Sequence, residues 1–109
     1  MNATALLEAP VGRRVDDACR AEATHFLTGI VGHHLDLVRW DPTHQLQGHA
    51  IVDGHELIVI APRDVAHEPA VFTAEDWDEI QHSPSEDRVT LLRSRRITSH
   101  RRLLDALAA

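Results

Sequence analysis

The sequence predicts a single small α+β domain built on one mostly antiparallel sheet. Its 109 residues are enough for one hydrophobic core, which as a prior means one domain. The pair Asp53-Gly54 separates two runs rich in β-branched residues, which predicts a β-hairpin over residues 49–61. Apolar residues recur at helical spacing before this hairpin, and helix-start signals follow it. We therefore expect one domain over residues 13–109, with helices on both sides of a central hairpin.

The first expected element is an amphipathic helix over residues 14–35. Ahead of it, Pro10-Val11-Gly12 is typical of a loop, so residues 1–12 are expected to form a flexible arm. Within residues 14–35, apolar residues repeat at helical spacing and would form one face of the helix. Gly29 and Gly32 each lower the helix propensity by about 1 kcal/mol relative to alanine. They would mark a close backbone contact or the fraying end of the helix.

A short strand and then the hairpin are expected next. Apolar and polar residues alternate over residues 35–40, and Asp41-Pro42 ends this strand. Aspartate and glycine tolerate the positive φ angles of a two-residue type I′ turn, so Asp53-Gly54 fixes the register of the hairpin. In that register His49 lies opposite Ile58. Both faces of the hairpin are largely apolar, so each face needs cover from helices or from a second subunit.

Two helices and a further strand are expected after the hairpin. Thr73 is a good N-cap for a helix over residues 74–82, with an acidic residue at the capping-box position. Alternation over residues 88–93 is typical of a strand. A last helix over residues 98–107 would be capped by Thr98 or Ser99.

Composition excludes several classes of enzyme. The chain is 43% hydrophobic and 26% charged, which is typical of a globular protein. All 11 basic residues are arginine, so the lysine that Walker-type phosphate loops and Schiff-base enzymes need is missing. The one cysteine, Cys19, falls on the apolar face of the first helix, where burial makes a thiol inert. We identify no catalytic residue and favour a non-enzymatic function.

Cysteine content and hydropathy predict a cytoplasmic protein. A single cysteine cannot form an internal disulfide, so nothing points to an oxidising compartment. Glu8 interrupts the apolar N-terminal stretch before a signal-peptide core could form. No segment approaches the roughly 20 apolar residues that a membrane-spanning helix needs.

Four side chains of the first expected helix form the best candidate metal site. At about 100° per residue they fall within roughly 80° of one another on the helix surface. These residues are Glu22, His25, His33 and Asp36. The Glu-x-x-His spacing lets carboxylate-bridged di-metal sites draw two ligands from one helical turn. An enzyme or sensor that binds a divalent metal through these residues is thus one alternative function. The other interpretation is that they form the ordinary polar face of a surface helix.

The charges of the C-terminal half are unevenly distributed. Residues 64–87 hold eight acidic residues and no basic one, whereas residues 88–104 hold six arginines and no acidic residue. The candidates for binding a partner, an anion or nucleic acid are Arg93, Arg95, Arg96, Arg101 and Arg102. We favour the alternative that these arginines neutralise the acidic helix around residues 75–79, because a protein with a net charge of −6 repels DNA.

Residues 48–80 resemble a family of small actinobacterial proteins of unknown function. The resemblance rests on Ile58-Val59-Ile60-Ala61-Pro62-Arg63-Asp64, and on Phe72-Thr73 followed by Trp77, which opens a short helix. The chain departs from the family pattern at Val65 and Ala66, where serine and lysine are usual, and by one extra residue before Trp77. Members are commonly encoded beside helix-turn-helix regulators, so the resemblance implies such a regulator as a partner. Phe72 and Trp77 also fit a hydrophobic staple around the Thr73 cap, which is a local explanation of the same residues.

These observations together favour a small cytosolic binding or regulatory protein that acts through a protein partner. The two apolar faces of the expected hairpin, and the few helices available to cover them, predict self-association, most simply as a homodimer.

Overall fold

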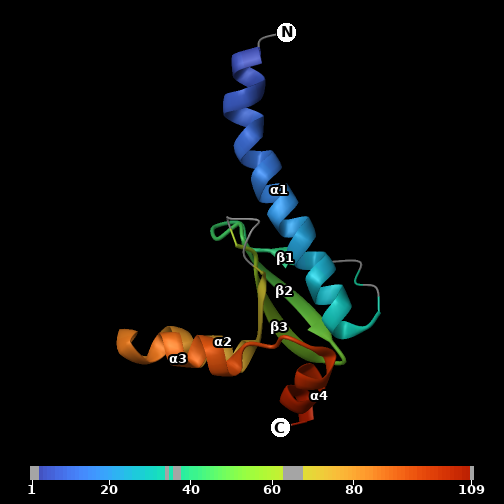
Figure 1. The fold of residues 1–109 in the computed structure, drawn as a ribbon, viewed down its shortest axis with the longest axis vertical. Coiled ribbons are helices and arrows are strands. Elements are labelled where there is room, and N and C mark those ends of the chain that lie inside the picture. The colour runs from blue at the N-terminus through green and yellow to red at the C-terminus, as the bar shows by residue number, and fades with distance from the viewer. Residues whose placement is uncertain (1–2, 34, 36–37, 63–67, 109) are drawn as a thin grey trace.

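A long helix is followed by a four-stranded antiparallel sheet and three shorter helices within the described part of the chain (Figure 1). The structure is a computed structural model that describes residues 3–33, 35, 38–62 and 68–108, with side chains from Asp16 onward. The helices are α1 (Ala3–Val31), α2 (Ala74–His82), α3 (Ser85–Arg95) and α4 (His100–Ala108). The strands are β1 (Arg39–Trp40), β2 (Gln47–Val52), β3 (His55–Ile60) and β4 (Ala70–Thr73), and they lie in the order β1-β2-β3-β4. The chain therefore has the α+β architecture that the sequence predicts.

The bounds of α1 differ from the expected ones at both ends. The helix already begins at Ala3, so residues 3–12, which were expected to be a flexible arm, are helical. It ends at Val31 rather than at residue 35, because Gly32 adopts a φ of +89° that side-chain-bearing residues rarely take. The Gly32 N–H still donates to the Thr28 carbonyl oxygen at 2.9 Å, which closes the last turn.

The hairpin forms as its turn residues predict. Asp53 and Gly54 have φ angles of +51° and +80°, as a type I′ turn requires. The register pairs Val52 with His55 and His49 with Ile58. The prediction of the turn and of the register is confirmed.

One strand prediction is wrong, and one strand was not predicted. Residues 88–93 were expected to form a strand, but they lie inside helix α3. The strand that pairs with β3 is instead β4, which the sequence reasoning missed. Its outer edge is covered by the segment after α3, because the Ile97 N–H donates to the Val71 carbonyl oxygen at 2.8 Å. Of the strand expected over residues 35–40, the described part contains β1, while positions 36 and 37 lie outside the described residues.

Helix α2 begins at the predicted cap. The Thr73 hydroxyl accepts a hydrogen bond from the Asp76 N–H at 3.1 Å. The rings of Phe72 and Trp77, which flank the cap, have centroids 5.4 Å apart, as in a hydrophobic staple. The prediction of helix 74–82 is confirmed in its bounds.

Thr73→Ala is expected to lower the free energy of unfolding by about 1 kcal/mol, because an N-terminal N–H of α2 loses its acceptor. The measurement is urea unfolding followed by circular dichroism. Thr73→Ser keeps the acceptor and serves as the matched control. Equal stability of the wild type and the alanine variant would show that the cap contributes nothing.

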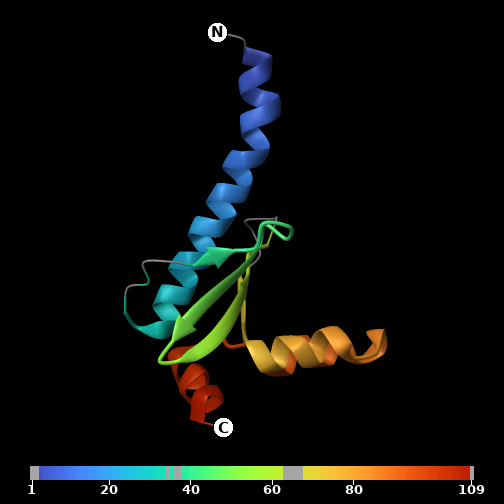
Figure 2. The ribbon, with the colours of Figure 1, turned by 180° about the vertical axis from the view of Figure 1, so that it is seen from behind.

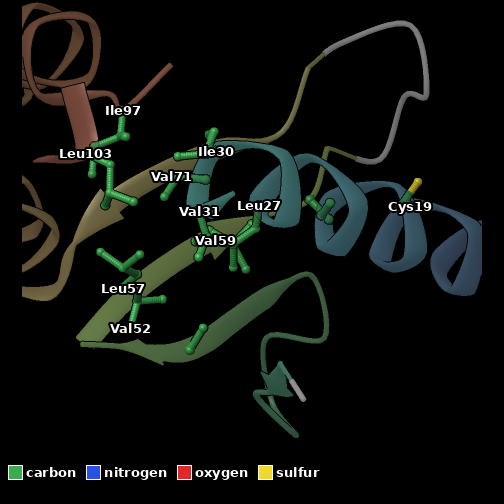
Figure 3. Close-up of a cluster of buried hydrophobic side chains, with 13 residues drawn as sticks. Cys19, Leu27, Ile30, Val31, Val52, Leu57, Val59, Val71, Ile97 and Leu103 are labelled. Carbon is green, nitrogen blue, oxygen red and sulfur yellow. The ribbon is translucent and has the colours of Figure 1, made fainter. Parts of the chain in front are cut away.

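The main core lies between α1, α4 and the inner face of the sheet (Figure 3). The buried side chains labelled there are Cys19, Leu27, Ile30, Val31, Val52, Leu57, Val59, Val71, Ile97 and Leu103. The His100 ring nitrogen Nδ1 lies 2.8 Å from the Ile30 carbonyl oxygen and so joins the start of α4 to the end of α1. The burial of Cys19, which is 1% exposed, agrees with its expected place on the apolar face of the first helix.

The outer face of the sheet is covered only in part. Ile58, Phe72 and Ile80 are buried there, outside the main core, and they lie between β3, β4 and α2. Helices α2 and α3 form an antiparallel helical hairpin that extends away from the sheet, and the N-terminal part of α1 extends in another direction (Figure 2). The radius of gyration is 15.4 Å, against about 13 Å for a compact domain of similar length. Helix α2 does not cover the part of the outer face formed by β1 and β2, and the candidate site lies there.

Candidate functional site

The structure describes three of the four candidate metal ligands, Glu22, His25 and His33. Glu22 and His25 are exposed side chains of α1, but His33 follows the end of that helix and so leaves the expected helical face. Asp36 lies outside the described residues. Within residues 3–33, 35, 38–62 and 68–108, no group of three or more His, Cys, Asp or Glu side chains is placed to hold a metal ion.

Arg95 is paired with the acidic helix. Its Nη1 lies 2.6 Å from Asp76 Oδ1 and 3.0 Å from Glu79 Oε2. The hydrogen bond and charge of Asp76, and then the charge of Glu79, raise the pKa of the Arg95 guanidinium. These contacts join the end of α3 to the start of α2, which makes the two helices antiparallel.

The other candidate arginines divide into two groups. Arg96 donates to the carbonyl oxygens of Glu68 and Pro69, and Arg102 donates to that of Ser94. Arg93 and Arg101 are exposed and form no ion pair with a described residue. Three of the five arginines thus have partners within the protein, and the carboxylates within 4.0 Å are Asp76 and Glu79 for Arg95 and Glu68 for Arg96.

A hollow of about 700 Å³ lies on the uncovered part of the outer face. The residues that line it on β1, β2, β3 and the turn after β1 include Arg39, Pro42, His49, Ile51 and Glu56. We call these five residues the open sheet patch. Ile51 is the most exposed large hydrophobic residue of the described chain, with 75% of its surface accessible. The patch therefore combines an exposed apolar side chain with charged groups around a concavity.

The strand register explains why these side chains share a face. Directly paired residues of neighbouring strands point to the same side of a sheet. Arg39 pairs with His49, and Ile51 pairs with Glu56. Because α2 starts directly after β4, it covers the β3–β4 side and leaves Ile51 exposed.

The charged groups of the patch lie on both sides of β2. His49 Nδ1 is 2.9 Å from Glu56 Oε1, and Glu56 Oε2 accepts no hydrogen bond from a described residue. Arg39 is exposed and makes no ion pair within the described part of the chain. The patch thus presents a cation on β1 and a carboxylate oxygen on β3 to whatever covers the face.

Asp41, which also lines the hollow, is turned into the loop after β1. Its Oδ1 accepts hydrogen bonds from the N–H groups of Thr43 and His44, both at 2.7 Å. These bonds, first that of His44 and then that of Thr43, lower the pKa of the Asp41 carboxyl below its ordinary value. Asp41 therefore shapes the loop at the rim of the patch and is already satisfied there.

A second hollow, of about 530 Å³, lies near the middle of α1 and is lined by Asp16, Leu46, Ile60, Trp77 and neighbouring residues. The Trp77 Nε1 atom is buried and has no hydrogen-bond partner among the described residues.

No family model, no curated protein and no solved structure matches the chain. Among the helices of the described residues, none is both long enough and apolar enough to cross a membrane. The resemblance of residues 48–80 to the actinobacterial family therefore stays an expectation.

Sequence reasoning did not single out the open sheet patch. The register that it predicted correctly already places Ile51 opposite Glu56 on one face. Which part of that face stays uncovered depends on the position of α2, and this helix follows the unpredicted strand β4.

Proposed function

We propose that the protein is a small non-enzymatic binding protein of the cytosol that self-associates and acts through a protein partner. The observation that carries the proposal is the open sheet patch, where Ile51 remains 75% exposed in a concave part of the sheet. Burying an isoleucine side chain contributes roughly 1.5–3 kcal/mol, so covering this position favours association. The resemblance of residues 48–80 supports a helix-turn-helix regulator as the kind of protein partner.

Two features of the fold support a binding role over a catalytic one. The charged groups of the patch, Arg39 and Glu56, are exposed around an apolar centre, as in the rim and core of a protein–protein interface. The α2–α3 hairpin extends from the body, and α3 has no buried residue, so it offers further surface to a partner.

Self-association is tested by sedimentation velocity and light scattering at micromolar concentration. We expect a mass of twice 12.2 kDa for the wild type and 12.2 kDa for Ile51→Glu, because the charge would be buried in the interface. Val89→Glu is the matched control, since Val89 is 59% exposed on α3, away from the patch. A wild-type mass of 12.2 kDa throughout would refute the proposed self-association.

A further inference from the structure

We propose that the second hollow binds a primary alkylammonium group, with the Asp16 carboxylate as its counter-charge and the Trp77 ring in its wall. The hollow lies between residues of α1, the end of β3 and α2. Its volume of about 530 Å³ falls within the range of roughly 300–1,000 Å³ that is typical of small-molecule sites. No described residue lines both this hollow and the open sheet patch. The proposal therefore adds a ligand site to the proposed function and does not depend on self-association.

Asp16 supplies the charge of the hollow. Its side chain is half-buried on α1 and forms no hydrogen bond or ion pair with a described residue. Among the described residues that line the hollow, it is the only carboxylate, and none of them is an arginine. A partly buried carboxylate without a cationic partner favours a ligand of opposite charge.

The cation at the rim of the hollow is already neutralised. The Arg20 Nη1 atom donates to the Gln45 carbonyl oxygen at 3.2 Å. The Nη2 atom of the same guanidinium forms an ion pair with Asp17. Asp16 and Asp17 thus oppose the single charge of Arg20, and one negative charge remains for a ligand.

Apolar groups form another part of the wall. Leu46, Ile60, Ala61 and Trp77 line the hollow. Because the Trp77 Nε1 atom is buried, the ring carbons and not the indole N–H reach the hollow. An aromatic wall accepts the methylene groups of a ligand and attracts a cation that lies over its face.

Three glutamines add hydrogen-bond acceptors. Gln45, Gln47 and Gln81 line the hollow, and their side-chain amides form no hydrogen bond with a described residue. Each amide oxygen can accept an N–H, and an ammonium group has three N–H donors and no acceptor. The carboxylate and the amide oxygens together therefore match an ammonium group.

These features select an ammonium group on an alkyl chain over other ligands. An anion would meet the Asp16 carboxylate without an arginine in the described lining, and a neutral apolar molecule would leave that carboxylate unpaired. Free alkylamines and lysine side chains share the required chemistry. The chain itself contains no lysine, so a lysine side chain in the hollow would belong to a different protein.

The test follows the indole N–H signals of the two tryptophans by heteronuclear NMR at pH 8, where a histidine side chain is neutral. The probes are pentylammonium for a free amine and Nα-acetyl-lysine amide for a lysine side chain. Their neutral counterparts are n-pentanol and Nα,Nε-diacetyl-lysine amide. We expect the Trp77 signal to move with both cations, and each neutral counterpart to bind about tenfold more weakly or worse. Trp40 lines the other hollow, so its signal should stay in place, and Trp40→Phe assigns the two signals.

Asp16→Asn keeps the shape of the side chain and removes its charge. We expect this variant to bind both cations about tenfold more weakly or worse, because a charged hydrogen bond is lost. Glu22→Gln is the matched control, since Glu22 is an exposed carboxylate of α1 outside the hollow, and it should leave binding unchanged. Circular dichroism shows that both variants keep the fold of the wild type.

The outcomes decide between a cation site and a merely apolar hollow. Neutral counterparts that bind as tightly as the cations, or an Asp16→Asn variant that binds like the wild type, would overturn the proposal. A Trp77 signal that moves with neither cation would overturn it as well. Tighter binding of the lysine amide than of pentylammonium assigns the site to a lysine side chain, and the reverse order assigns it to a free amine. None of these readouts uses the mass of the protein in solution, so self-association is judged separately.

Discussion

Leu57→Ala is expected to lower the free energy of unfolding by about 2–5 kcal/mol. Leu57 is 0% exposed in β3, where it points into the main core between the sheet and the helices. Truncation removes buried apolar contacts and leaves a cavity that the surrounding strands and helix cannot fully close. Urea unfolding followed by circular dichroism measures the change.

The control for this substitution is Val89→Ala, because Val89 is 59% exposed on α3. Such a surface change should stay within about 0.5 kcal/mol. A loss for Leu57→Ala no larger than that of the control would contradict the position of Leu57 in the core.

Gly48→Ala is expected to cost about 1–3 kcal/mol, because overpacking a filled site forces the neighbouring groups to move. A Cβ atom at position 48 would lie 2.6 Å from Val38 Cγ1 and 3.0 Å from the ring of Trp40. Both neighbours are themselves packed against the core, so they have little room to shift. The midpoint of urea unfolding is the measurement.

Gly29→Ala provides a control of opposite sign. A Cβ atom at position 29 meets nothing within 4 Å, and Gly29 lies in helix α1. Alanine there should stabilise the protein by roughly 0.5–1 kcal/mol. If Gly48→Ala left the midpoint of unfolding unchanged or raised it, as expected for Gly29→Ala, the close approach of Trp40 to β2 would be wrong.

The features that could be predicted from the sequence depend on short-range chemistry. The turn at Asp53-Gly54 requires two positive φ angles, and these residues accept them, so the hairpin and its register follow. The Thr73 cap and the acidic first turn of α2 likewise involve groups within one helical turn.

The alternation over residues 88–93 predicts a strand, but charge signals at both ends of this segment favour helix α3 instead. Glu86 and Asp87 lie in its first turn, and Arg93 and Arg95 in its last turn, which complements the helix dipole. The Arg88 side chain also donates to the carbonyl oxygens of Gln81 and Ser83 at the end of α2. The charges at the two ends of α3 can be read from the sequence. The hydrogen bonds of Arg88 depend on the packing of α3 beside α2.

The candidate site could be predicted only in part for the same reason. That Ile51 and Glu56 share a face follows from the turn. That this part of the face stays uncovered depends on β4, which pairs with β3 from outside the hairpin and leads α2 over the β3–β4 half of the same face. The metal candidate rested on helical spacing that ends at Gly32. Of the candidate arginines, Arg95 pairs with Asp76 and Glu79 of the acidic helix, as the favoured alternative expects, whereas Arg96 and Arg102 donate to backbone carbonyl oxygens.

The hydrogen bond from the Ile97 N–H to the Val71 carbonyl oxygen attaches the segment after α3 to the edge of the sheet. The chain leaves the sheet at Thr73 and returns to it at Ile97, so both ends of the α2–α3 hairpin are fastened at its base. Arg95 and Asp76 add an ion pair at the same place. The tip, over residues 82–90, can therefore unravel without breaking any hydrogen bond of the sheet, which makes it a local unit of fluctuation separate from the core.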